Sequence, residues 1–146
     1  MDQSQIVRIA ARLAELEAHR GILESGRNLV TPETATQIRS KFPGIPEDYI
    51  EYLQRVGAGS FLSCSYSVYS TLMKPEDIFD SNDSAWPKDL LIFGDNFSGD
   101  LGVFAPSNDW AVGELWHDDR TIIWHEKTFS SFLETLIEDL AGDDPH

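Results

Sequence analysis

Carboxylates and tryptophans gather on the predicted turns and strand edges of the segment Leu90–Trp116 and just beyond it. Carboxylates at such positions either accept hydrogen bonds from their own turn or face solvent, where they attract a cationic partner. Tryptophan beside them favours a protein interface, because an indole buried at an interface centre contributes about 2 kcal/mol or more. The residues selected as a candidate contact surface are Asp95, Asp100, Asp109, Trp110, Glu114, Trp116 and Asp118. The chemistry indicated is recognition of a protein.

These residues also have ordinary structural explanations. Asp95 and Asp109 are residues that turns use, because their side chains bond their own backbone. Trp116 and Trp124 could equally belong to the hydrophobic core, whereas Trp110 falls on a turn and is expected to be more exposed. The sequence leaves these alternatives open.

Motifs for catalysis are missing. The glycines of Gly94–Gly102 do not have the dinucleotide-binding spacing, and no lysine follows a glycine run to form a phosphate-binding loop. The same segment lacks the alternating acidic ligands of a calcium loop. His117 and His125 could meet across two strands, but such pairs are more often structural than metal-binding. We therefore expect no enzyme activity, no cofactor and no metal site.

The charge of the chain is unevenly distributed. The net charge is −14; residues 1–73 hold seven basic and eight acidic residues, and residues 74–146 hold four basic and seventeen acidic ones. Nucleic acid is an unsuitable partner, because affinity for phosphates depends on Lys and Arg. A basic protein is a suitable one, since an acidic surface accelerates its association. Acidity that serves only solubility is the alternative.

Length and composition predict one domain, residues 1–146, with a core that needs no disulfide, since Cys64 is the only cysteine. No apolar run approaches the roughly 20 residues that span a bilayer, so no membrane association is expected. The N-terminal segment mixes charges into a helical pattern and lacks the apolar core of a signal peptide. A cytoplasmic location is the default expectation.

Four helices are predicted from apolar spacing and start signals. The first covers residues 3–25, with Gly26 as its expected stop. Thr31 and Pro32 start a short helix, Pro46 starts a third, and Thr128 caps a closing amphipathic helix.

Strands are predicted between these helices. Two early ones are Ser60–Leu62 and Ser63–Tyr69, three lie within Leu90–Trp116, and a last one is Thr121–His125. Short turns join most of them, so they should pair antiparallel. The fold class expected is α+β: a single domain with a mostly antiparallel sheet of about five or six strands, covered by the N-terminal helices and a C-terminal helix.

Three segments in this order resemble the SUKH superfamily. The first is Pro43–Leu53 followed by Gly57–Phe61, a proline-led helix that runs into a glycine break and a strand. The second is Ile92–Phe104, two strands around a turn with Gly and Asp, and the third is the Thr-Phe entry to the closing helix, Thr128–Leu133. The resemblance covers residues 32–141. Gly57-Ala58-Gly59 departs from the Asn-Gly-Gly of many members, which affects the local turn only.

The resemblance implies a non-catalytic α+β domain. Many bacterial members are immunity proteins that neutralise a polymorphic toxin, often a nuclease or nucleic-acid deaminase, and a fungal branch regulates cell-wall synthesis. With the acidic surface, it predicts an immunity protein that binds a basic protein toxin. The alternative is a regulatory or scaffold protein with an endogenous protein partner. The identity of the toxin and the oligomeric state stay open.

Overall fold

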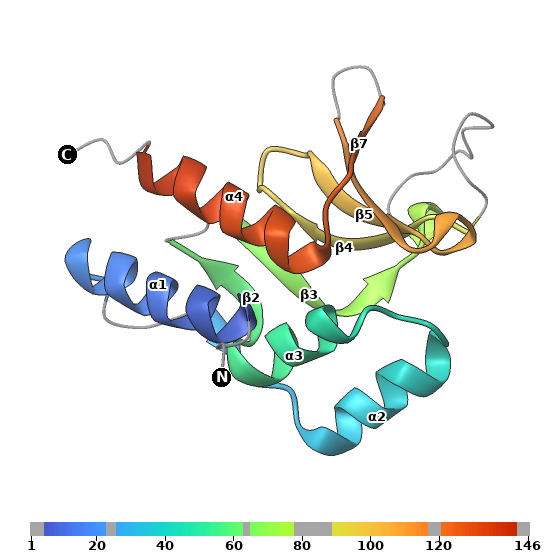
Figure 1. Cartoon of the computed structure of the whole chain (residues 1–146), viewed down its shortest axis with the longest axis horizontal. Coiled ribbons are helices and arrows are strands. Elements are labelled where there is room, and N and C mark those ends of the chain that lie inside the picture. The colour runs from blue at the N-terminus through green and yellow to red at the C-terminus, as the bar shows by residue number, and fades with distance from the viewer. Residues whose placement is uncertain (1–4, 23–25, 63–64, 78–88, 117–120, 143–146) are drawn as a thin grey trace.

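Seven strands follow one another across a single antiparallel sheet in the order of the chain (Figure 1). The computed structural model describes residues 5–22, 26–62, 65–77, 89–116 and 121–142. The strands are β1 (Gly26–Asn28), β2 (Ala58–Phe61), β3 (Tyr66–Met73), β4 (Leu91–Asp95), β5 (Leu101–Ala105), β6 (Ala111–Leu115) and β7 (Ile122–His125). The helices are α1 (Gln5–His19), α2 (Pro32–Lys41), α3 (Glu47–Arg55) and α4 (Phe129–Gly142).

The α+β prediction is confirmed, with one or two strands more than expected. The strand that the sequence did not predict is β1, a polar triplet without any apolar alternation. The early strands were also misplaced by a few residues. The predicted strand Ser60–Leu62 is Ala58–Phe61, because Leu62 has left-handed backbone angles (φ 51°) and ends it. The predicted strand Ser63–Tyr69 begins at Tyr66 and continues to Met73, and residues 63–64 lie outside the described residues.

Helix starts follow the predicted signals. The Thr31 hydroxyl accepts a hydrogen bond from the Thr34 amide at 3.1 Å, and the Thr128 hydroxyl accepts one from the Ser131 amide at 3.1 Å. Pro46 precedes α3 without a side-chain cap. These contacts satisfy amide groups that the first turn of a helix leaves unpaired.

The first helix is shorter than the predicted 3–25. It ends at His19, and Gly21 rather than Gly26 stops it. Gly21 adopts φ +74°, and the next amide, of Ile22, donates to the Glu17 carbonyl at 2.8 Å. Glycine tolerates this left-handed geometry, which closes the carbonyls of the last turn.

Helices α1, α3 and α4 pack on one another along one side of the sheet, and α2 packs against α3 (Figure 1). On this side the core is rich in aromatic rings: Tyr49 and Phe129 meet edge to face with centroids 5.3 Å apart, and Phe93 lies 4.7 Å from Phe104. A smaller cluster, Leu90, Ile92, Leu101, Val103 and Leu115, fills the other side of β4, β5 and β6. The central strands are therefore apolar on both faces.

Candidate binding surface

The structure divides the predicted contact residues between the two ends of the β5–β6 pair. Leu101 pairs with Leu115 at one end and Ala105 pairs with Ala111 at the other. Five strand residues span roughly 17 Å. Asp95, Asp100 and Trp116 flank the first end, here called the Trp116 end, and Glu114 lies one position inside it. Asp109 and Trp110 form the other end, the Trp110 end, and Asp118 lies outside the described residues.

At the Trp116 end, two carboxylates are committed to the β4–β5 turn. The Asp95 carboxylate accepts hydrogen bonds from the Tyr69 hydroxyl at 2.5 Å and the Phe97 amide at 2.7 Å. The Asp100 carboxylate accepts one from the Asn96 side-chain amide at 3.1 Å. Burial and the bond to Asp95 raise the pKa of Tyr69, so its hydroxyl stays protonated and donating. The turn explanation therefore accounts for the bonds to Phe97 and Asn96, and the Tyr69 bond ties Asp95 to β3 as well.

The Trp110 end borders a groove of about 570 Å³. It lies where the starts of α3 and α4 meet the β5–β6 connection, and its lining residues are Pro46, Glu47, Asp48, Asp109, Trp110, Ala111, Val112, Glu126, Lys127, Thr128 and Phe129. The Trp110 ring packs edge to face on Phe104, with centroids 5.6 Å apart and an interplanar angle of 70°. Trp110 is thus half-buried against the core, which corrects the expectation of an exposed turn residue.

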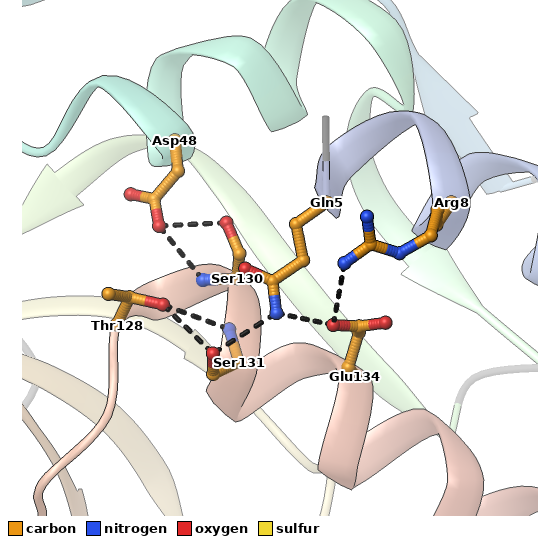
Figure 2. A network of polar contacts seen from close by, with 7 residues as sticks. All are labelled: Gln5, Arg8, Asp48, Thr128, Ser130, Ser131 and Glu134. Carbon is orange, nitrogen blue, oxygen red and sulfur yellow. Dashed lines mark hydrogen bonds and ion pairs between the residues drawn. The ribbon is translucent and has the colours of Figure 1, made fainter. Parts of the chain in front are cut away.

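A polar network holds the helices beside this groove (Figure 2). Asp48 of α3 accepts hydrogen bonds from the Ser130 amide at 3.0 Å and the Ser130 hydroxyl at 2.8 Å. Gln5 of α1 donates to the Ser131 hydroxyl at 3.1 Å and to Glu134. Asp48 of α3 thereby accepts a hydrogen bond from an amide that the first turn of α4 leaves without an intrahelical partner. Its carboxylate is engaged within the protein.

The remaining carboxylates of the groove differ in their contacts. Glu47 pairs with Arg39 at 2.9 Å, whereas Asp109 and Glu126 are exposed. Asp109 and Trp110 both have left-handed backbone angles, φ 54° and 58°. Aspartate tolerates this geometry better than most residues, so Asp109 also has a turn role.

Glu114 and the exposed aromatic residues lie on the β6–β7 hairpin. The Glu114 carboxylate is 2.8 Å from Nε2 of His125, and the His125 ring packs on Phe132 with centroids 5.4 Å apart. Trp116 is 45% exposed and Trp124 is 42% exposed. The core interpretation of these two tryptophans is therefore wrong.

Sequence reasoning missed two residues of this surface. Ile123 is 38% exposed beside Trp124, and neither was selected as a contact residue. Within Thr121–His125, three consecutive residues (122–124) are apolar without polar alternation, which is unusual for a solvated last strand. That pattern was the available signal.

A second groove, of about 610 Å³, lies over β1, β2, β3 and the start of α2. Its lining is uncharged and more apolar than polar, with apolar atoms from residues such as Leu29 and Met73 and hydroxyls from Thr31, Ser67 and Thr71. It shares no residue with the predicted contact surface. Within the described ranges, no group of three or more His, Cys, Asp or Glu side chains could hold a metal ion. None of the described helices is long and apolar enough to cross a membrane.

Comparison with protein-family models matches residues 29–135 to the SMI1 / KNR4 family (SUKH-1). The chain belongs to this family. The SUKH-1 match confirms the resemblance and extends from the residue after β1 into α4. Members of SUKH-1 are generally non-catalytic immunity or regulatory proteins. No curated protein and no solved structure matches the chain.

All seven predicted contact residues fall inside the SUKH-1 region. So do Ile123 and Trp124, whereas α1 and β1 precede it. The β6–β7 hairpin is thus part of the family domain itself.

Proposed function

We propose that this SUKH-1 protein is a cytoplasmic immunity protein that neutralises a cognate protein toxin by binding it, without a reaction of its own. The observation that carries the proposal is the β6–β7 hairpin, which leaves Trp116, Ile123 and Trp124 exposed. Large apolar side chains exposed on one surface element favour a protein interface, here with Trp116 and Ile123 on one face of the hairpin and Trp124 on the other. They belong to the half of the chain with four basic and seventeen acidic residues.

The proposed contact surface centres on this hairpin and reaches both ends of the β5–β6 pair. A standard interface buries about 800 Å² on each partner, a patch roughly 28 Å across. The two ends are separated by roughly 17 Å, so one interface can include both of them. The proposed contact residues are Asp95, Asp100, Asp109, Trp110, Glu114, Trp116 and Asp118, to which we add Ile123 and Trp124.

A toxin that acts on nucleic acid suits this surface. Enzymes that bind DNA or RNA carry Lys and Arg along the path of the phosphates. Carboxylates such as Asp109 and Glu126 can pair with those cations, while the exposed indoles exclude water around them. Occupation of the basic cleft then blocks the substrate.

The test is co-expression with the product of the adjacent upstream gene, which we expect to be the toxin. The wild-type chain should restore growth, and the double variant Trp116→Ser with Trp124→Ser should fail to do so while circular dichroism shows that it is still folded at the growth temperature. Leu29→Ser is the matched control, because Leu29 is exposed but lies beside β1. Growth rescue by the double variant equal to wild type would reject the hairpin as the contact surface.

The function itself is tested separately. Failure of the wild-type chain to restore growth, together with stable capture of an endogenous cell protein, would support the regulatory alternative instead. Isothermal titration with the purified toxin domain should show binding that weakens as salt is raised.

A further inference from the structure

The sheet ends at β7, and no described residue pairs with the outer edge of that strand. Native proteins usually protect such an edge with Lys, Pro or a β-bulge, because its unpaired amide and carbonyl groups bind other strands. The strand Ile122–His125 contains neither Lys nor Pro, and its pairing with β6 has no register shift. Within the described residues, the outer edge of β7 therefore lacks these three protections.

The pairing pattern identifies which backbone groups face outward. The Trp116 amide donates to the Thr121 carbonyl at 2.9 Å, and these two residues continue the β6–β7 register. Hydrogen-bonded and non-hydrogen-bonded pairs alternate along an antiparallel ladder. Ile123 and His125 therefore direct their amide and carbonyl groups toward β6, and Ile122 and Trp124 direct theirs toward the open edge.

Side chains offer apolar contact on both sides of this edge. Ile122 and Trp124 pair with Leu115 and Gly113 on the side away from the helices. A Cβ atom on Gly113 would lie 2.8 Å from the indole, so the indole covers this glycine closely. Ile123 lies on the opposite side, toward the helices, since it pairs with Glu114. An added strand would meet one large apolar side chain on each face.

Charge decides between the possible occupants. Glu114 lies on the neighbouring strand, where it pairs with His125, and Glu126 directly follows β7, with Lys127 bonded to Thr135 of α4. A second copy of this chain would bring another net charge of −14 to the same edge, which opposes its addition. An extended segment rich in Lys or Arg would instead be attracted.

We propose that β7 binds an extended, basic segment of the toxin as an eighth strand of the sheet. This inference rests on the proposed function and names its binding mode. Main-chain hydrogen bonds at Ile122 and Trp124 supply the register, and alternate side chains of the added strand contact Trp124 or Ile123.

Amide hydrogen exchange of the wild-type protein tests the proposal directly. The probes are the toxin domain and a synthetic peptide, Lys-Val-Lys-Val-Lys-Val-Lys, with Glu-Val-Glu-Val-Glu-Val-Glu as the control. The amides of Ile122 and Trp124 should exchange about tenfold more slowly when the basic peptide exceeds its Kd tenfold. Those of Ile123 and His125 should be slow with and without it. Unchanged exchange at Ile122 and Trp124, or equal slowing by the acidic peptide, would overturn the proposal.

Two substitutions of Trp124 distinguish the contribution of its backbone amide to peptide binding from the contribution of its side chain. Trp124→Val keeps the outward amide, whereas Trp124→Pro removes it at a position where an edge strand tolerates proline. Binding of the basic peptide should weaken at least tenfold more in Trp124→Pro than in Trp124→Val. Circular dichroism melting checks that both variants fold, and equal binding by two folded variants would contradict strand addition.

The outcomes distinguish this inference from the proposed function. A toxin complex that forms without slower exchange at Ile122 and Trp124 rejects strand addition and leaves the immunity function intact. If the basic peptide slows amide exchange at Ile122 and Trp124 but the wild-type chain does not restore growth, the edge site is supported and the immunity function is rejected. A dimer in sedimentation that already protects both amides would assign the edge to a second copy and overturn the proposal.

Discussion

The two edges of the sheet are built in opposite ways. At the β1 edge, the Arg27 guanidinium donates two hydrogen bonds of 2.9 Å to the Glu17 carboxylate of α1. The Glu17 carboxylate also accepts a hydrogen bond from the Leu62 amide at 3.1 Å. The Arg27 and Glu17 side chains are only 11% and 9% exposed. At the β7 edge, by contrast, the apolar side chains of Ile123 and Trp124 are exposed to solvent.

A buried ion pair fixes the β1 edge, whereas the β7 edge carries the exposed apolar side chains on which the proposed binding rests. A buried ion pair with its lone pairs satisfied fixes where β1 lies, although it contributes little net stability relative to apolar packing. Ile123 and Trp124 on β7 keep 38% and 42% of their surface in contact with water, so apolar area remains there for a partner to cover. Substitutions should therefore act mainly on stability at β1 and mainly on binding at β7.

Glu17→Gln should have the largest effect. It leaves the Arg27 charge in a nearly buried site without its counterion, and loss of one partner of a buried pair costs about 3–5 kcal/mol. Urea unfolding followed by circular dichroism measures the change. A loss below about 1 kcal/mol would show that the β1 edge is not held by this pair.

The double variant Trp116→Ser with Trp124→Ser should affect binding more than stability, in contrast to Glu17→Gln. Toxin binding should weaken by about 2 kcal/mol or more, because the exposed parts of the indoles become buried only in the complex. The free energy of unfolding should also fall, by about 1 kcal/mol for each substitution, because each side chain is more than half buried in the free protein. Titration calorimetry and urea unfolding of the same samples measure the two quantities. A destabilised variant with unaltered affinity would contradict the assignment of this edge.

Acid should weaken the β1 edge selectively. Burial alone would raise the pKa of Glu17, but hydrogen bonds from Arg27 and the Leu62 amide outweigh it and lower the pKa below its ordinary value of 4.5. The pair therefore stabilises the fold above that pH, and the contribution is lost as pH falls through the lower, folded-state pKa. The stability difference between wild type and Glu17→Gln should narrow from pH 6 to pH 3, by at most about 1.4 kcal/mol per pH unit. If the stability difference between wild type and Glu17→Gln stays the same from pH 6 to pH 3, the ionised Glu17 carboxylate is not its source.

Glu47→Gln should have the smallest effect. It makes the same chemical change as Glu17→Gln, but the Glu47 side chain is 70% exposed in its pair with Arg39. Exposed pairs contribute about 0.5 kcal/mol. Urea unfolding beside Glu17→Gln gives the comparison, and similar losses in the two variants would remove the contrast between buried and exposed pairs.

Local signals in the sequence were sufficient for most elements. Thr31, Pro46 and Thr128 begin helices because capping and proline chemistry act over a few neighbouring residues. The strand β1 had no such signal, since Gly26–Asn28 is held by the contact of Arg27 with a helix ten residues earlier in the chain.

The binding surface was predicted in composition but not in arrangement. Sequence alone cannot say which strand ends the sheet, so it could not tell that Trp124 is exposed and that Trp110 packs against Phe104. Asp95 was named for recognition, and its contacts lie within its own turn and with Tyr69. Whether the seven named residues touch a partner is still a prediction.

Strand order equal to chain order has a consequence for how such a protein can diversify. A terminal strand has a single neighbour, so a new side chain at Ile123 disturbs only one ladder, whereas Trp124 packs on Gly113 and His125 packs on Phe132. If the partner protein changes during evolution, exposed residues of this last hairpin can be substituted one at a time. The aromatic core under α3 and α4 meanwhile keeps the fold constant.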